Sequence, residues 1–281
     1  MKHRFDQLDV FSAVPLKGNP LAVVHAAGAL TEATMAAFAR WTNLSETTFL
    51  LPPTDAQADY RVRIFTPQRE LPFAGHPTLG SCHAWLAAGG VPRRSGSVVQ
   101  ECGVGLVRIR RSGARLAFAA PPLCRGGPLE DTLLQRIVAG IGLTIEDVLQ
   151  HQWVDNGPGW CAVMLRSAAM VLAVEPDWGR LGDLKLGLVG AHAAGHPAQF
   201  ELRALIGDGN YEDPVTGSLN ASVAVWLIGA GLAPPVYLAT QGAALGRDGR
   251  VYIESETTAD DAVAVWVGGD VAACIEGSVE L

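Results

Sequence analysis

Two apolar segments, one in each half of the 281-residue chain, constrain its fold more than any other feature. Residues 75–90 read GHPTLGSCHAWLAAGG and residues 216–231 read TGSLNASVAVWLIGAG, a separation of 141 positions. Each segment begins with small and polar residues, continues through Ala, Leu and Trp, and ends on Gly. A helix that is apolar on all sides is normally buried on all sides. We therefore expect two buried helices, one in each half.

The segments around these helices repeat as well. Gly18–Val24 falls on Gly159–Leu165 under the same shift of 141 positions, and the helix tail 84–86 (AWL) falls on 225–227 (VWL). Both halves then follow the order strand, turn, strand, helix, strand, loop, buried helix, strands. One shift shared by separate segments indicates an internal duplication. Halves made of strands around a buried helix predict an α+β fold and not a Rossmann fold.

Hydrophobic periodicity and turn residues give the expected elements. Strands are predicted at 5–11, 21–24, 48–51, 60–65, 97–101, 106–110, 115–119, 153–155, 160–165 and 201–206, and further helices after Thr31, at 129–139 and at 144–149. Residues 43–47 are interpreted as a turn, and the residues before Asp213 as a loop. The length suits two domains of about 140 residues each. We place them at 1–120 and 121–281, with the last strand able to pack back on the first domain.

The composition is that of a compact globular protein, since 49% of the residues are hydrophobic and only 17% are charged. The net charge of −7, without a cluster of Lys or Arg, argues against a nucleic-acid partner. Five cysteines form no CxxC pair, so we expect reduced thiols in a cytoplasmic protein. The N-terminal MKHRFDQLDVF lacks the apolar segment of a signal peptide. Residues 219–233 are too short to span a bilayer comfortably, so no membrane association is expected.

The starts of the two buried helices are candidate anion sites. The first N–H groups of a helix have no internal partner, and the helix dipole places partial positive charge there. A substrate carboxylate is therefore a natural ligand, held between the two halves. Gly75 permits close approach of a ligand to the backbone. Gly217 and Ser218 begin the second helix, where Ser218 either donates to an anion or satisfies a neighbouring carbonyl.

Three ionisable residues near these starts are candidates for proton transfer. Glu46 either lies in a cavity with a pKa raised by desolvation or is a solvated turn carboxylate. His76, in the first turn, is either a general acid/base or an ordinary hydrogen-bonding residue. Asp213 is either a site residue or the cap of the second helix. His192 and His196 have the spacing of a helical metal pair but no third ligand nearby, so no metal is expected.

With these residues assembled, the chain resembles the phenazine-biosynthesis isomerase-like (PhzF-like) family, which shares the diaminopimelate epimerase fold. The matching segments cover nearly the whole chain in order, namely 5–11 (FDQLDVF), 18–24 (GNPLAVV), 43–49 (NLSETTF), 63–67 (RIFTP), 70–80 (ELPFAGHPTLG), 212–218 (EDPVTGS) and 241–242 (QG). The segment that ends at Gly80 is highly specific. The resemblance implies two pseudo-symmetric domains, each a mostly antiparallel β barrel around a central helix, with the active site between them.

The resemblance also implies roles for individual residues. The family's glutamate acid/base falls on Glu46, its histidine on His76 and its aspartate on Asp213. Gly75 and Ser218 fall where the family holds the substrate carboxylate. The implied reaction is a cofactor-free isomerisation, in which Glu46 removes a proton from carbon in a small carboxylate and returns it elsewhere. A homodimer is expected from the resemblance alone.

Two alternatives remain open at this point. The first is an epimerase or racemase of an amino acid that uses Glu46 and Asp213, and the second is a binder of a small acid or a protein without catalysis. Related epimerases use a pair of cysteines, but Cys82 lies more than a turn into its helix and has no counterpart around residues 220–222. The family usually continues from its Gln-Gly pair to Gly-Arg-Pro-Ser, whereas here Gly246-Arg247 is followed by Asp248-Gly249, which leaves the substrate open.

Overall fold

A computed structural model describes residues 1–257 and 263–281 of the chain. It divides into two compact units. Unit 1 comprises Met1–Ala119 together with Gly268–Leu281, and unit 2 comprises Ala120–Val267. Both units combine strands and helices, so the predicted α+β class is confirmed. The chain passes from unit 2 back to unit 1 within strand β16 (Val263–Gly269).

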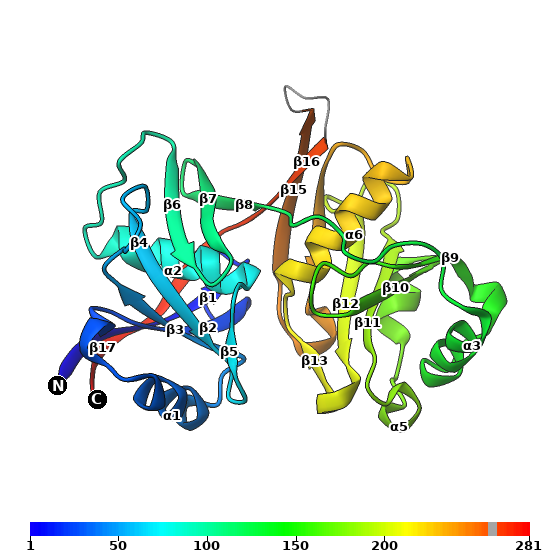
Figure 1. The fold of residues 1–281 in the computed structure, drawn as a ribbon. Helices are drawn as coiled ribbons and strands as arrows, with labels where there is room; N and C mark the ends of the chain where they lie inside the picture. The colour runs from blue at the N-terminus through cyan, green and yellow to red at the C-terminus, as the bar shows by residue number, and fades with distance from the viewer. Residues whose placement is uncertain (258–262) are drawn as a thin grey trace. The chain divides into compact units, whose positions relative to one another are not determined.

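Unit 1 is a curled sheet with one helix inside and one outside (Figure 1). Its elements are β1 (Lys2–Val10), β2 (Asn19–Val24), α1 (Glu32–Thr42), β3 (Glu46–Leu51), β4 (Tyr60–Phe65), β5 (Glu70–Leu71), α2 (Gly75–Ala87), β6 (Ser97–Cys102), β7 (Gly105–Ser112), β8 (Arg115–Ala119) and β17 (Val271–Glu280). The strands pair in the order β17-β1-β2-β3-β4-β6-β7-β8, with β5 also on β4. The pairs β2–β3 and β4–β6 are parallel and the others antiparallel. A helix connects each parallel pair, as such pairs require.

Helix α2 lies inside this sheet and contacts β1, β2, β3, β4, β6 and β8. Its residues from Gly75 to Cys82 are all buried, as the apolar segment predicts. Polar side chains on the helix find partners on the strands: Ser81 donates to Thr48 Oγ1 (2.9 Å), and Thr78 Oγ1 accepts from Gln100 (3.0 Å). Because unpaired buried polar groups are costly, these bonds fix how far the helix is inserted and how it is rotated.

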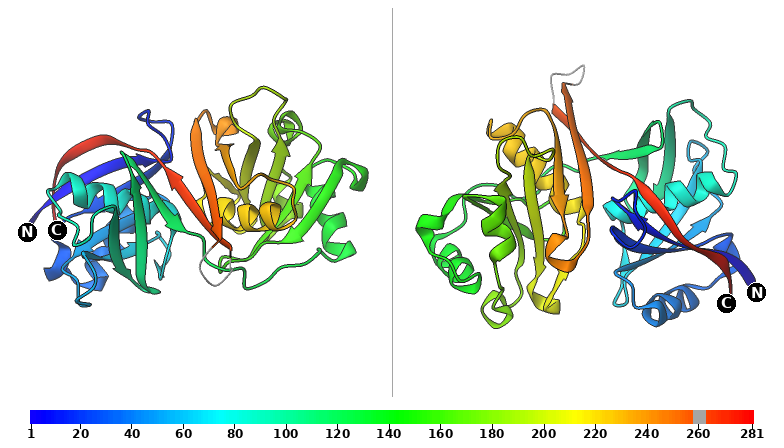
Figure 2. Two further views of the ribbon diagram at one scale, coloured as in Figure 1. Left: turned by 90° about the horizontal axis from the view of Figure 1, so that it is seen from above. Right: turned by 180° about the vertical axis from the view of Figure 1, so that it is seen from behind.

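The outer face of unit 1 carries α1. Thr31 caps this helix by accepting a hydrogen bond from the backbone N–H of Thr34, as the predicted start requires. Met35, Phe38 and Ala39 pack from α1 onto Phe49 of β3 in a second apolar core. The two ends of the chain lie side by side on β1 and β17, as Figure 2 shows from behind.

Unit 2 has a similar succession of strands, with one additional helix before its first strand and two short helices where unit 1 has α1. Its elements are α3 (Asp131–Gly140), β9 (Val148–Trp153), β10 (Trp160–Leu165), α4 (Ala168–Ala173), α5 (Trp178–Leu181), β11 (Lys185–Ala191), β12 (Phe200–Ile206), β13 (Tyr211–Asp213), α6 (Gly217–Gly229), β14 (Val236–Gln241), β15 (Gly249–Thr257) and the first residues of β16. The strands pair in the order β9-β10-β11-β12-β14-β15, with β13 also on β12. The pairs β10–β11 and β12–β14 are parallel.

This topology matches unit 1 strand for strand. In each unit the first four strands along the chain, β1 to β4 or β9 to β12, form an antiparallel, a parallel and an antiparallel pair. A short strand, β5 or β13, then pairs with the fourth strand, and the buried helix leads to a strand that pairs with the fourth strand in parallel. Strand β10 follows β2 by 141 positions at both ends, the shift found in the sequence. Both buried helices have 13 residues. An internal duplication accounts for all of these correspondences.

Three local expectations are wrong. Residues 46 and 47 belong to β3 and not to a turn, because parallel pairing to β2 begins at Glu46. Residues 144–149 form only a 3-10 turn at 145–147 before β9 begins at Val148. The residues before Asp213 form the short strand β13, which pairs with β12. In addition, no residue range was predicted for α4, α5, β5, β11 or β14 to β17. Strand β11 contains two glycines, which weaken a strand pattern.

Close packing of α2 gives a test of this fold. A Cβ atom at Gly80 would lie 2.4 Å from Leu21 Cδ2 and 2.9 Å from Val10 Cγ2, inside the unit. We therefore expect Gly80→Val to lower the free energy of unfolding by about 2 kcal/mol or more through overpacking. Gly229 at the end of α6 has nothing within 4 Å of the same atom, so Gly229→Val is the matched control. Urea denaturation measures both, and equal stabilities would show that α2 is not confined as described.

Candidate active site

Glu46 and His76 meet inside unit 1. Glu46 is the first residue of β3 and His76 the second residue of α2, and His76 Nε2 lies 3.2 Å from Glu46 Oε2. The side chain of Glu46 is 15% exposed and that of His76 is 6% exposed. The contact does not have hydrogen-bond geometry, so His76 Nε2 has no hydrogen-bond partner in the part of the chain that the structure describes. A buried polar atom in this condition is rare in native proteins and needs an explanation.

Burial determines the charge of His76. Desolvation lowers the pKa of His76 from 6.5 to about 3, so the imidazole is neutral at pH 7. The contact with Glu46 therefore joins a carboxyl group to a neutral ring and is not an ion pair. A neutral imidazole carries one N–H donor and one acceptor nitrogen. The pair thus combines a carboxylate that can take a proton with a ring that can donate or accept one.

Gly75 begins α2 beside His76. The residue before it, Ala74, has no side chain that could cap the helix, and the first turn contains no acidic residue. The free N–H groups of the first turn are therefore not neutralised by the helix itself, and the dipole favours a negative group nearby. Gly75 is buried, as a residue that allows close backbone approach should be.

In unit 2, Asp213 belongs to a hydrogen-bonded network before α6. Thr216 Oγ1 donates to Asp213 Oδ2 at 2.5 Å, and Gln241 Nε2 donates to Asp213 O at 3.0 Å. Gln241 Oε1 accepts from Thr216 N and from Asn220 Nδ2, at 3.0 and 2.8 Å. The N-cap position of α6 is occupied by Thr216. Asp213 is therefore not the cap of this helix, which was the structural alternative to a site role.

A buried ion pair holds the strand that carries Asp213. Arg203 on β12 binds both carboxylate oxygens of Glu212, and the two side chains are 6% and 5% exposed. The same guanidinium donates to Val171 O and Val174 O at the end of α4, at 3.2 and 2.6 Å. Since bidentate pairs of this kind have fixed geometry, β13 and Asp213 keep a defined position on β12.

Ser218 is the second residue of α6, the position that His76 has in α2. Its hydroxyl oxygen accepts from Trp160 Nε1 at 3.0 Å, and its carbonyl accepts from Asn156 Nδ2 at 3.0 Å. Gly217, before it, is buried. The structure thus brings together Glu46, His76 and Gly75 in unit 1, and Asp213, Gly217 and Ser218 at the start of α6 in unit 2.

The residues that sequence reasoning did not select are those that hold the site residues in place. Gln241 and Thr216 both stand in matching segments, 241–242 and 212–218, but neither was assigned a role. Asn220 and Trp160 lie in apolar segments. The only sequence signal for them is a polar residue within an apolar helix and a large aromatic residue at the start of an apolar strand.

The two units differ at the position of Glu46. Glu46 pairs with Leu21 across β2 and β3; the equivalent pair across β10 and β11 is Ala162 with Gly187. A Cβ atom at Gly187 would lie 2.5 Å from Leu219 Cδ1 of α6, so unit 2 has no room for a carboxylate there. Only unit 1 therefore has a glutamate at this point of the repeat.

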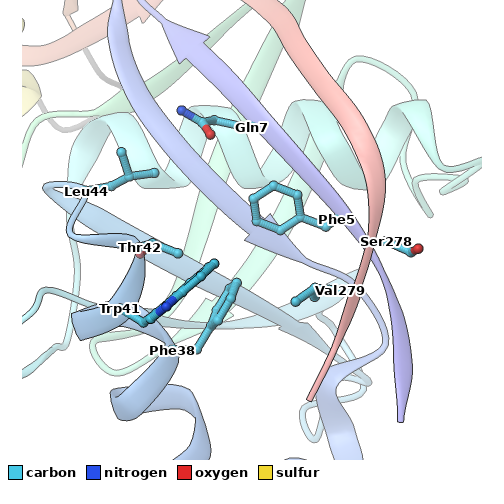
Figure 3. A pocket seen from close by; sticks show the side chains of 8 residues that line it. All are labelled: Phe5, Gln7, Phe38, Trp41, Thr42, Leu44, Ser278 and Val279. Carbon is cyan, nitrogen blue, oxygen red and sulfur yellow. The ribbon is translucent and has the colours of Figure 1, made fainter.

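Unit 2 contains a second buried contact of this kind, since His192 Nε2 lies 3.5 Å from Glu201 Oε2 and burial raises the pKa of Glu201. Figure 3 shows an apolar recess of about 400 Å³ on unit 1, with Trp41 stacked on Phe38. Its lining residues are Phe5, Gln7, Phe38, Trp41, Thr42, Leu44, Ser278 and Val279, none of which is ionisable. Among residues 1–257 and 263–281, no group of three or more His, Cys, Asp or Glu side chains is placed to hold a metal ion. The rings of His192 and His196 are stacked, with centroids 3.8 Å apart.

Among the residues that the structure describes, no helix is long and apolar enough to span a membrane.

Known proteins match the chain along almost its whole length. The sequence profile of the PhzC-PhzF family, described as phenazine biosynthesis-like protein, matches residues 8–277. The chain belongs to the PhzC-PhzF family. A relative in this family, the trans-2,3-dihydro-3-hydroxyanthranilate isomerase of Pseudomonas aeruginosa, is 31% identical and aligns with 99% of this chain and 100% of its own. The antisense-enhancing sequence 1 protein of Schizosaccharomyces pombe is 34% identical over 98% of both chains.

Solved structures of the PhzC-PhzF family share the fold. The crystal structure of the Bacillus anthracis phenazine biosynthesis protein of the PhzF family superposes with a TM-score of 0.86 at 20% identity, and the match covers all of both chains. The named relatives and this fold identify the present PhzC-PhzF protein as an isomerase. The resemblance stated from the sequence is confirmed.

The buried neutral state of His76 makes stability depend on pH. Unfolding exposes the ring and returns its pKa to 6.5, so between about pH 3 and 6.5 the unfolded chain binds one more proton than the folded chain. This contribution to stability is complete above pH 6.5 and is lost as the pH falls toward 3. We expect the free energy of unfolding to change with pH by up to about 1.4 kcal/mol per pH unit because of His76, and we expect His76→Asn to remove this contribution. Urea denaturation at a series of pH values measures it, and an unchanged slope in the variant would contradict the assignment.

Proposed function

We propose that the protein is a cofactor-independent isomerase that moves a proton within a small carboxylate or amino-acid-derived substrate and thereby shifts a double bond. The observation that carries the proposal is the buried contact of 3.2 Å between Glu46 and His76. A carboxylate in a largely dry site is a suitable base for an activated C–H bond. The neutral ring beside it supplies a donor and an acceptor without adding charge.

The reaction follows from these two groups. Glu46 removes a proton from an sp³ carbon next to a double bond, and the electron pair of the broken C–H bond forms a new double bond. The original double bond shifts its electrons to its far carbon, which takes up a proton delivered by Glu46 or through His76. Atoms and electrons balance within the substrate, so no oxidant, reductant or cofactor is required. Low exposure of both side chains keeps water from competing for the proton.

The residues at the start of α6 support binding of the substrate carboxylate. Ser218 presents a hydroxyl, and the first turn of α6 contains Gly217 and no acidic residue. Both features favour an anion at the helix start. We propose that Gly217 and Ser218 bind the carboxylate, that Gly75 of α2 is a further substrate-binding residue, and that Asp213 is an additional acid/base residue or binds an amino group of the substrate.

The names of the relatives support a proposal for the substrate class. The Pseudomonas aeruginosa relative is named for trans-2,3-dihydro-3-hydroxyanthranilate, a cyclic unsaturated amino acid. In such a compound the ring double bonds activate a C–H group, as the proposed proton shift requires. We propose that the substrate of this protein belongs to the same class of unsaturated cyclic amino acids.

An epimerase that uses two carboxyl groups is the second candidate, because Asp213 offers a second acid/base group. A two-thiol epimerase is disfavoured by the structure: Cys82 is buried, and burial raises its pKa to about 12, so the thiol does not ionise near neutral pH. Product analysis separates the candidates, since an epimerase inverts a stereocentre and an isomerase moves a double bond. The homodimer implied by the resemblance stays a prediction, which the native mass in solution checks.

Substitution of Glu46 tests the proposed function. We expect Glu46→Gln to reduce exchange of substrate C–H for deuterium in heavy water by at least about a thousandfold, because the amide cannot accept the proton. The assay uses trans-2,3-dihydro-3-hydroxyanthranilate and a panel of cyclic unsaturated amino acids. Circular dichroism and the melting temperature show whether the variant is folded.

Glu32→Gln is the matched control, because Glu32 lies in the same unit, is 73% exposed and pairs with Arg63 at 2.8 Å. It should exchange at the wild-type rate. A folded Glu46→Gln protein with full exchange activity would contradict the proposal.

A further inference from the structure

Glu201 is a buried carboxyl group of unit 2 that the proposed reaction does not use. It lies on β12, and its side chain is 3% exposed. Glu201 Oε2 accepts a hydrogen bond from Thr240 Oγ1 of β14 at 2.5 Å, whereas Oε1 has no hydrogen-bond partner among the residues that the structure describes. An ionised carboxylate loses hydration at both oxygens when it is buried, and here only one of them gains a donor in exchange. The environment therefore favours the neutral acid.

Two histidines connect this carboxyl group to the surface of the unit. His192, just after β11, places Nε2 2.8 Å from Thr240 Oγ1 and 3.5 Å from Glu201 Oε2. Burial, and after it the charge of His196, lowers the pKa of His192, so its ring is neutral at pH 7. His196 is exposed, and its ring is stacked on that of His192 with an angle of 18° between the planes. Glu201 is thus buried, but the groups beside it extend to solvent, with which they exchange protons.

The number of hydrogens in the cluster determines how its hydrogen bonds run. Thr240 has one hydroxyl hydrogen and stands between Glu201 and His192. If Glu201 is ionised, the hydroxyl donates to the carboxylate, and the hydrogen bond between Thr240 and His192 must come from an Nε2–H group. If Glu201 is protonated at Oε2, the acid donates to Thr240, and the hydroxyl donates to His192 Nε2, which is closer than its other acceptor, Phe200 O at 3.2 Å. The neutral ring then carries its hydrogen on Nδ1.

The charged groups around Glu201 act on it in opposite directions. Burial, the largest effect, raises the pKa of Glu201, and the carboxylate of Glu212 on β13 adds to this. The hydrogen bond from Thr240 and the charges of Arg203 and His196 lower this pKa, but the net effect is a raised value. Arg203 is itself paired with Glu212 and donates to two carbonyl groups at the end of α4. Its charge is therefore shared and does not offset that of an ionised Glu201.

We propose that Glu201, Thr240 and His192 form a proton-operated switch in unit 2. Binding of one proton to Glu201 reverses both hydrogen bonds of the Thr240 hydroxyl and transfers the hydrogen of the neutral His192 ring from Nε2 to Nδ1 by exchange with solvent. The cluster takes up one proton in total. With the proton bound, the carboxyl group is neutral; without it, a carboxylate with one donor is buried where β12 pairs with β14. The switch therefore sets an alkaline limit to the stability of unit 2, independently of proton transfer by Glu46.

The tautomer of His192 in the intact protein tests the switch. Long-range proton–nitrogen correlation spectra distinguish a ring with hydrogen on Nδ1, a ring with hydrogen on Nε2 and a cation, and His192→Asn identifies the signals. We expect wild type to pass from the Nδ1–H form to the Nε2–H form as the pH rises from about 5 to about 9. Glu201→Gln cannot ionise, so its tautomer should not change with pH. A single tautomer of wild type at every pH, or the same change in Glu201→Gln, overturns the proposal.

Stability gives a second measurement, which needs no assignment of signals. Because its pKa is raised, folded Glu201 keeps its proton above pH 4.5, where the unfolded chain has lost it. Wild type should therefore lose stability relative to Glu201→Gln as the pH rises from 4.5 to the pKa of the folded group, and the urea midpoints of the two proteins measure this. Glu254→Gln is the matched control, because Glu254 is exposed on β15 of the same unit, and its midpoint should follow that of wild type. A difference between Glu201→Gln and wild type that is the same at every pH contradicts the proposal.

Discussion

The isomerisation that we propose depends on one buried contact, that of Glu46 with His76. Placing a carboxyl group and an imidazole in a nearly dry environment costs free energy, which the surrounding fold must offset. The curled sheet of unit 1 does so by enclosing α2 and fixing its insertion through buried hydrogen bonds to Thr48 and Gln100. Burial keeps His76 neutral, so the ring acts on proton position without carrying charge.

Duplication of the fold has been followed by a division of roles between its two copies. At equivalent points of the repeat, unit 1 has Glu46 and unit 2 has Gly187. The side chain of Leu219 packs against Gly187 and occupies the space that a side chain there would need. At the second position of the buried helix, unit 1 has His76 and unit 2 has Ser218. One copy thus carries the two groups that we propose to transfer a proton, and the other carries a hydroxyl and a helix start that suit an anion. The same backbone fold supports both roles because the two units differ in the side chains at the start of the buried helix and on one strand.

The sequence predicts the parts of this structure that depend on local pattern. The two buried helices, the 141-residue repeat and strands β4, β8 and β10 are recovered because apolar periodicity and turn residues encode them directly. Glu46 was placed on a turn because its membership of β3 comes from pairing with β2, a contact between distant segments. The same reason hides Trp160 and Gln241, which act on α6 across 58 and 25 positions. Strand β11 was missed because Gly187 and Gly190 are set by packing against α6 and Ser167.

The most direct test of a neutral His76 beside Glu46 is the pH dependence of deuterium exchange by wild type and His76→Asn. If His76 acts as a neutral ring, its protonation does not change the activity near its ordinary pKa of 6.5. The ratio of the two kcat/KM values should then stay constant from about pH 5 to about pH 8. A ratio that changes about tenfold per pH unit on one side of 6.5 would show that His76 titrates in the working enzyme, and would contradict the account.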